Sequence, residues 1–166
     1  MQGKLQYVKG DVTNPQGKGT ILIPHICNNV GGYGAGVAKA IARKWPEAAQ
    51  CYREHIKDFF NNKLPILGTV NRVHIYNDDN EIYIMNMIAQ SGYISNENPR
   101  PIKYTALIKC MDLVMLDVKS DERLDNASIH CPKFGSKLSG GDFNFVLALI
   151  NEIWIDNGID VTIYEF

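Results

Sequence analysis

Residues 21–46 read ILIPHICNNVGGYGAGVAKAIARKWP, and this stretch decides the fold. An apolar run comes first, four glycines follow within six residues, and an amphipathic segment then ends at a proline. This order predicts a buried strand, a loop and the first turn of a helix. Glycines allow positive φ and a close approach to a ligand, and the free amides of a helix's first turn favour an anion. We predict a phosphate-binding loop here, while a tight turn that binds nothing stays open as the simpler alternative.

Strands and helices alternate along the whole chain of 166 residues. The apolar patterns predict strands at residues 5–8, 20–26, 68–76, 81–89, 128–132 and 160–164. They predict helices at residues 35–44, 47–61, 102–118 and 143–157. The segments 68–76 and 81–89 flank a polar turn at 77–80, which indicates an antiparallel hairpin. We expect a single α/β domain, residues 1–166, with helices on both faces of a mixed, mostly parallel sheet.

The composition narrows the classes of partner. Lysine and arginine number 17 against 18 aspartate and glutamate residues, with no basic stripe, so nucleic acid is not the expected partner. Four cysteines lie far apart without a CxxC pair, which predicts reduced thiols rather than disulfides or a metal site: Cys27, Cys51, Cys110 and Cys131. No apolar run approaches the ~18 residues of a membrane span. We expect a cytoplasmic protein with no membrane partner.

A second glycine-rich loop, FGSKLSGGD at residues 134–142, lies between the predicted strand at 128–132 and the predicted helix at 143–157. Loops that leave the carboxyl ends of neighbouring parallel strands meet at one edge of a sheet, where α/β proteins bind their ligands. Two facing loops of this kind predict a ligand with a pyrophosphate or two phosphates. Neither loop matches a P-loop or the dinucleotide motif G-x-G-x-x-G.

Four polar residues near these loops are candidates for chemistry, and each has a structural alternative. Asp11 follows a strand and a glycine, where it suits the exocyclic amine of adenine or a turn. His25 precedes the first loop and suits acid–base or nucleophilic chemistry at phosphorus, or a place in the core. Asn28 suits a sugar hydroxyl. Asp142 suits the orientation of a water molecule or the cap of the last helix.

Other side chains are candidates for enclosing a ligand at its ends. The long polar loop at residues 90–101 offers three for the distal end: Gln90, Tyr93 and Arg100. Three aromatic residues toward the carboxyl terminus suit either stacking on a base or core packing: Phe143, Tyr164 and Phe166.

The order of these motifs resembles that of the macro domain. The resemblance rests on Gly10-Asp11-Val12-Thr13, on His25-x-Cys27-Asn28, on the glycines of the first loop and on residues 135–143, and it runs the length of the chain. More narrowly, the chain is similar to the small single-domain branch that includes yeast-type ADP-ribose-1″-phosphate phosphatases and the terminal ADP-ribose-protein glycohydrolase. The resemblance implies a three-layer α/β/α fold that binds ADP-ribose.

The resemblance also implies a role for each matching residue. Asp11 would hold the adenine amine beside the Val12 amide, and Asn28 would hold the distal ribose. The pyrophosphate would be clasped by the amides of Gly34, Ala35, Gly36 and Val37 and by those of Gly135, Ser136, Lys137, Leu138, Ser139 and Gly140. His25 occupies the place of a histidine in the phosphatase branch, and Asp142 lies near that of an acidic residue in the glycohydrolase branch. The lysine that forms a covalent adduct in that second branch has no counterpart in residues 86–90.

These implications favour a monomeric hydrolase that removes the 1″-phosphate of ADP-ribose-1″-phosphate, using His25, Asn28 and Asp142 and neither a metal nor a cofactor. A second interpretation is cleavage of O-acyl-ADP-ribose or of ADP-ribosyl-carboxylate esters, in which Asp142 would matter more than His25. A third is an ADP-ribose-binding module without turnover. A fourth, binding of RNA or poly(A), has the charge balance against it.

Overall fold

The computed structural model describes residues 1–76 and 80–165. Its strands are β1 (Leu5–Lys9), β2 (Gly19–Asn28), β3 (Val70–Ile75), β4 (Asn80–Gln90), β5 (Ser128–Pro132) and β6 (Val161–Glu165). Its α-helices are α1 (Gly36–Lys44), α2 (Pro46–Asn61), α3 (Tyr104–Ser120) and α4 (Phe143–Leu149). Within these described residues, none of the helices combines the length and apolar character needed to cross a membrane.

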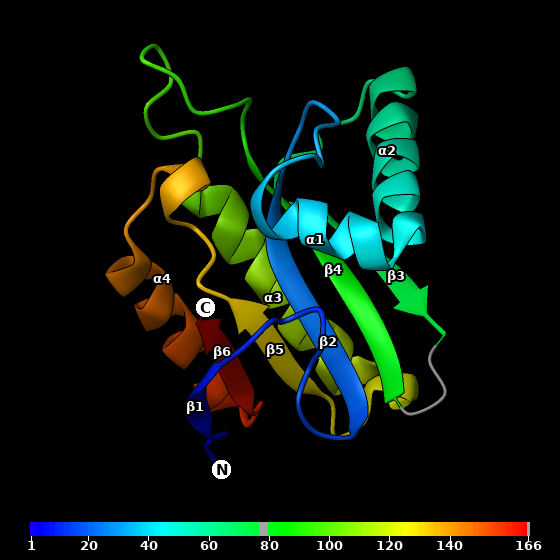
Figure 1. Ribbon diagram of the computed structural model, residues 1–166, viewed down its shortest axis with the longest axis vertical. Helices are drawn as coiled ribbons and strands as arrows, with labels where there is room; N and C mark the ends of the chain where they lie inside the picture. Colours follow the sequence, from blue (N-terminus) through cyan, green and yellow to red (C-terminus); the bar gives the residue numbers. More distant parts are fainter. Residues whose placement is uncertain (77–79, 166) are drawn as a thin grey trace.

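The strands form one sheet in the order β1-β6-β5-β2-β4-β3. The β3–β4 pair is antiparallel and the other pairs are parallel, which confirms the predicted mixed, mostly parallel sheet. Residues 77–79 of the polar turn expected in the hairpin lie outside the described residues, and Asn80 already belongs to β4. Because parallel strands end at one edge, the segments that follow β2, β4 and β5 leave the sheet together, at the upper edge in Figure 1.

Helices cover both faces of the sheet, which confirms the three-layer α/β/α fold (Figure 1). Strand β2 shows why its sequence is a continuous apolar run. Ile21 and Ile23 are fully buried in the cluster that includes Ile41 of α1 and Tyr52 of α2. Leu22 between them is fully buried in the opposite cluster, which includes residues of α3 and α4. Successive side chains of a strand point to opposite faces, so a strand with helices on both sides needs apolar residues at every position.

The predicted last helix, 143–157, changes geometry along its length. Helix α4 continues as a π-helical turn at Ile150–Trp154 and a 3₁₀ turn at Ile155–Asn157, and Gly158 ends it with φ of 83°. Trp154 is fully buried in this segment, and its indole N–H donates to the carbonyl oxygen of Met111 on α3 at 3.0 Å. This contact packs the last helical segment against α3.

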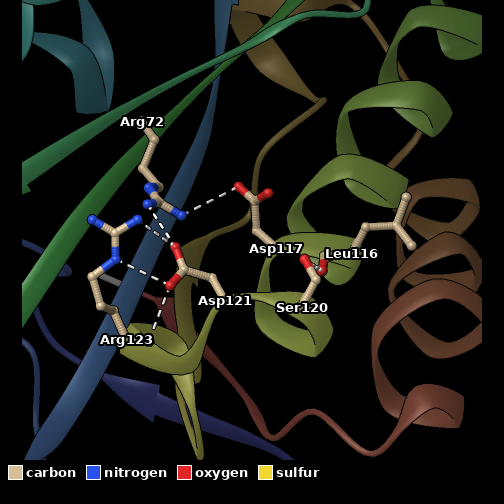
Figure 2. Close-up of polar contacts among 6 residues, drawn as sticks. All are labelled: Arg72, Leu116, Asp117, Ser120, Asp121 and Arg123. Atoms are coloured by element: carbon tan, nitrogen blue, oxygen red, sulfur yellow. Dashed lines mark hydrogen bonds and ion pairs between the residues drawn. The ribbon is translucent and has the colours of Figure 1, made fainter.

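An ion-pair network ties the end of α3 to the edge strand β3 (Figure 2). Asp121 accepts hydrogen bonds from the guanidinium groups of Arg72 at 2.8 Å and Arg123 at 2.9 Å. It also accepts from the main-chain N–H of Arg123 at 3.0 Å and caps the 3₁₀ turn Glu122–Leu124. Asp117 lies 3.6 Å from Arg72 and completes the group. These hydrogen bonds hold the pKa of Asp121 well below its usual range.

Candidate functional site

A cavity of about 810 Å³ opens at the carboxyl edge of the sheet. Its wall is built by residues 10, 12, 26–28, 32–38, 90, 93–94, 132–139 and 164–165. The order of the strands sets the two ends of this cavity. Residues beside β1 and β6 lie at one end, and residues that follow β4 lie at the other. The two glycine-rich loops, which follow β5 and β2, therefore lie between them, as the sequence predicts.

Asn28 organises the first glycine-rich loop. Its Oδ1 accepts from the amides of Val30 at 2.9 Å and Gly32 at 3.1 Å, and its Nδ2 donates to the Gly32 carbonyl at 2.9 Å. The hydroxyl of Tyr52 on α2, which has one proton to donate, lies 2.7 Å from the carbonyl oxygen of Asn28 and 2.8 Å from the same Oδ1. Asn28 is 7% exposed and lines the cavity. The side-chain amide of Asn28 thus holds the loop in its conformation, and the residue also forms part of the cavity wall.

Helix α1 begins at Gly36, where φ is 58°. Gly36, Val37 and Ala38 line the cavity, and the first amides of a helix have no partner within the helix. The first turn of α1 carries no acidic side chain. A Cβ at Gly36 would lie 3.2 Å from Cδ1 of Leu138, so the two glycine-rich loops approach each other at this point. The arrangement suits an anion between the loops.

The second loop needs glycine at two positions, because the backbone has a positive φ there and a Cβ atom would have no space. Gly135 has φ of 89°, and a Cβ there would lie 2.7 Å from Val146 on α4. Gly140 has φ of 71°, and a Cβ there would lie 2.3 Å from the carbonyl oxygen of Pro99. The loop is thus wedged between α4 and the loop at residues 91–101.

The structure brings most of the predicted site residues together. Eleven of them line the cavity: Val12, Asn28, Gly34, Ala35, Gly36, Val37, Gly135, Ser136, Lys137, Leu138 and Ser139. Four do not line it: Asp11, His25, Gly140 and Asp142. Of the residues considered for the ligand's ends, Gln90, Tyr93 and Tyr164 line the cavity and Arg100 and Phe143 do not. Phe166 lies outside the described residues.

His25 is not at the mouth of the first loop, where the sequence places it, but behind the cavity wall. Its side chain is fully buried, and its Nε2 lies 2.6 Å from Oδ1 of Asn86 and 3.0 Å from the hydroxyl of Tyr33. Asn86 donates through Nδ2 to Asn71 and therefore presents its oxygen to the imidazole. Burial lowers the pKa of His25 to about 4, so the ring is neutral at pH 7. Its contact with the cavity runs through Tyr33, which lines the wall.

Asp142 and Asp11 occupy the structural roles that the sequence left open for them. Asp142 is exposed and accepts from the amide of Asn144, which makes it the N-cap of α4. Asp11 is exposed beside the cavity-lining residue Val12, and its Oδ1 accepts from the amide and the hydroxyl of Thr13 at 2.8 and 2.7 Å. Only one of its two carboxylate oxygens takes part in these hydrogen bonds.

Tyr164 is held in place at the β1–β6 end of the cavity. Its oxygen accepts from the Gln16 amide at 2.8 Å and lies 2.6 Å from Nδ1 of His130. Nε2 of His130 faces the hydroxyl of Ser128 at 3.0 Å, and the tautomer of the ring sets which of its two nitrogens donates. Burial lowers the pKa of His130 to about 4, which keeps the ring neutral.

Sequence reasoning missed an ion pair in the cavity wall. Nζ of Lys133 lies 2.9 Å from a carboxylate oxygen of Glu165, and both residues line the cavity. Lys133 also lies over the ring of Phe143, 5.6 Å from its centre. Lys133 directly follows β5, at the carboxyl end of a parallel strand, where ligand-binding residues are common. This position could have been identified from the sequence. Its partner is visible only once β5 and β6 are paired.

Among residues 1–76 and 80–165, no three or more His, Cys, Asp or Glu side chains gather closely enough to hold a metal ion.

No family model matches the sequence. A curated protein of Lodderomyces elongisporus named ADP-ribose 1″-phosphate phosphatase is 25% identical over 96% of this chain and 97% of that protein. A protein of the same name from Meyerozyma guilliermondii is 35% identical over 66 residues, which is 38% of that protein's length.

Solved structures match the whole fold. The structure of Thermosipho africanus DarTG in complex with ADP-ribose has a TM-score of 0.71 at 16% identity and shows the shared fold alone, over 97% of this chain and 41% of that one. The structure of a macrodomain protein from Streptomyces coelicolor has a TM-score of 0.80 and 32% identity, and the match covers 98% of this chain and 99% of that one. With this identity over nearly the full length of both chains, the protein belongs to the macrodomain family.

Proposed function

We propose that this protein is an ADP-ribose-binding hydrolase and that it removes the 1″-phosphate of ADP-ribose-1″-phosphate. The observation that carries the proposal is the cavity between the two glycine-rich loops, with the amino end of α1 in its wall. The curated fungal relatives named ADP-ribose 1″-phosphate phosphatase support the reaction. A volume of about 810 Å³ is in the range of small-molecule sites.

The order of the strands supports one orientation of the ligand. The adenosine would lie at the β1–β6 end, near Val12 and Tyr164, with Asp11 at the rim. The pyrophosphate would lie between the loops, where the amides of α1's first turn offset its charge. The distal ribose and its 1″-phosphate would then lie at the β4 end, beside Asn28 and Gln90.

A specific observation favours a second candidate, an ADP-ribose-binding module without turnover. His25 and Asp142, the two residues proposed for proton transfer, do not line the cavity. In the phosphatase, His25 would act through Tyr33 as a positioning residue, and catalysis would rest on electrostatic neutralisation of the phosphates and on orientation. In the module, the same cavity would hold ADP-ribose and release it unchanged.

Two measurements on one preparation test the proposal. We expect release of inorganic phosphate from ADP-ribose-1″-phosphate and binding of ADP-ribose in a calorimeter. Binding without phosphate release on prolonged incubation identifies the module instead. The ester-cleaving alternative is identified if the protein cleaves O-acetyl-ADP-ribose or an ADP-ribosylated glutamate peptide but releases no phosphate from ADP-ribose-1″-phosphate. If ADP-ribose does not bind, the whole proposal is wrong.

We also propose that the protein is a cytoplasmic monomer whose partner is ADP-ribose or a 1″-derivative, and not nucleic acid. The four free cysteines, three of them buried, suit a reducing compartment. Sedimentation of the purified protein tests whether it is a monomer. Its retention on immobilised poly(A) at low salt tests whether it binds nucleic acid.

A further inference from the structure

Three buried polar side chains line the cavity: Asn28, Gln90 and Ser139, which are 7%, 8% and 7% exposed. The other buried polar residues of the described chain do not line it. A buried polar group beside a ligand space is costly unless it is paired, so its hydrogen bonds show which of its atoms remain for a ligand.

Gln90 and Ser139 form a pair of fixed polarity. Nε2 of Gln90 donates to the carbonyl oxygen of Gly92 at 3.0 Å, which turns Oε1 toward Ser139. The hydroxyl of Ser139 donates to that Oε1 at 3.0 Å. A serine hydroxyl has one proton and two lone pairs. With its proton committed to Gln90, Ser139 can offer a ligand only an acceptor.

The backbone holds Ser139 in this position. Its carbonyl oxygen accepts from the amide of Ile102 at 3.0 Å, and its amide donates to the carbonyl oxygen of Ser136 at 3.1 Å. Gln90 is itself the last residue of β4 and pairs with Asn28 of β2 in the parallel register. The pair therefore belongs to the β4 end of the cavity, next to Asn28.

We propose that Ser139, oriented by Gln90, accepts a hydrogen bond from a hydroxyl group of the distal sugar and thereby selects ligands that carry a distal ribose over nucleoside diphosphates that lack one. This inference rests on the proposed function, which puts the distal ribose at the β4 end. A sugar hydroxyl has a proton to donate. The outer oxygens of an ionised phosphate have none, so the Ser139 oxygen gains no hydrogen bond from them. Ser139 is thus a specificity-determining residue and Gln90 its positioning residue.

The test compares the affinities for ADP-ribose and ADP, which differ in whether a ribose follows the second phosphate. In Ser139→Ala we expect the affinity for ADP-ribose to fall about threefold to tenfold, the range of one hydrogen bond, with the affinity for ADP unchanged. Gln90→Met keeps the length of the side chain without its oxygen. We expect it also to lower the preference for ADP-ribose over ADP. Ser91→Ala, one residue beyond Gln90 and outside the cavity wall, is the matched control and should keep the wild-type ratio.

The outcomes separate this inference from the proposed function. An unchanged ratio of the two affinities in Ser139→Ala, or in Gln90→Met where the alanine variant does not fold, overturns the role of Ser139. An equal loss for both ligands also overturns it, since damage to the fold would not distinguish them. A wild-type protein that binds neither ligand overturns the proposed function, and the inference with it.

Discussion

His25 illustrates what a single residue shows once its surroundings are known. In the sequence it is an imidazole at the end of an apolar run, beside a glycine-rich loop. In the structure it belongs to a buried polar cluster with Tyr33 and Asn86, and Sγ of Cys27 lies 3.7 Å from its Nε2. The partners come from a loop and from β4, so no local pattern could identify them. The ring supports the cavity wall from behind.

The burial of two histidines predicts a loss of stability in mild acid. The pKa values of His25 and His130 are each lowered to about 4, against about 6.5 in an unfolded chain. Between these two pKa values the unfolded state therefore binds more protons than the folded state. The free energy of unfolding is largest above pH 6.5 and falls as the pH drops toward 4. Each histidine accounts for at most about 3–4 kcal/mol. Urea unfolding at pH 7.5, 6 and 5 measures the slope.

His25→Gln and His130→Gln are each expected to flatten this pH dependence, even where they lower stability at pH 7.5. A slope that both variants leave as steep as in the wild type would contradict the burial of neutral imidazoles as its cause.

Asn28 is expected to be the most sensitive side chain of the first loop. Asn28→Ala leaves the amides of Val30 and Gly32 without their acceptor, at about 1–3 kcal/mol for each group that stays buried. We expect lower thermal stability and at least a tenfold loss of ADP-ribose affinity, measured by calorimetry. Asn144→Ala, at an exposed position on α4, is the control, and equal affinities of the two variants would contradict the role of Asn28.

The elements themselves could largely be predicted from the sequence. The periodicity of apolar residues and the positions of glycine and proline predict the strands, the helices and both glycine-rich loops, because these signals are local. The π-helical turn at Ile150–Trp154 could not be predicted, since it accompanies the packing of Trp154 on α3. The pair of Gln90 and Ser139 could not be predicted either, because it joins residues 49 positions apart.

At the junction of the first loop with α1, Gly36→Ala should weaken ADP-ribose binding. A non-glycine residue at φ of 58° is strained, and its Cβ would press on Leu138 across the gap between the loops. The loop amides would shift, and we expect a loss of about tenfold in affinity, equivalent to about 1.4 kcal/mol. Gly17→Ala is the matched control, because its φ is also positive at 108°, no atom lies within 4 Å of the added Cβ, and it lies outside the cavity wall. Equal affinities of the two variants for ADP-ribose would contradict the prediction.

At the scale of the whole molecule, the cavity depends on how the chain crosses the sheet. Its two ends come from opposite sides of the strand order, with β1 and β6 at one end and β4 at the other. A ligand that fills its length contacts segments from near both termini and from the middle of the chain. Binding should therefore stabilise the fold as a unit, and not one loop alone.

ADP-ribose is accordingly expected to raise the midpoint of thermal unfolding. A ligand at one hundred times its dissociation constant stabilises the native state by about 2.7 kcal/mol. For a chain of 166 residues this corresponds to a rise of about 5–10 °C. In the orientation proposed above, AMP would reach only the β1–β6 end and should give a smaller rise at the same concentration. Scanning calorimetry with both ligands measures the difference, and equal rises would mean that the pyrophosphate and distal ribose find no site between the loops and β4.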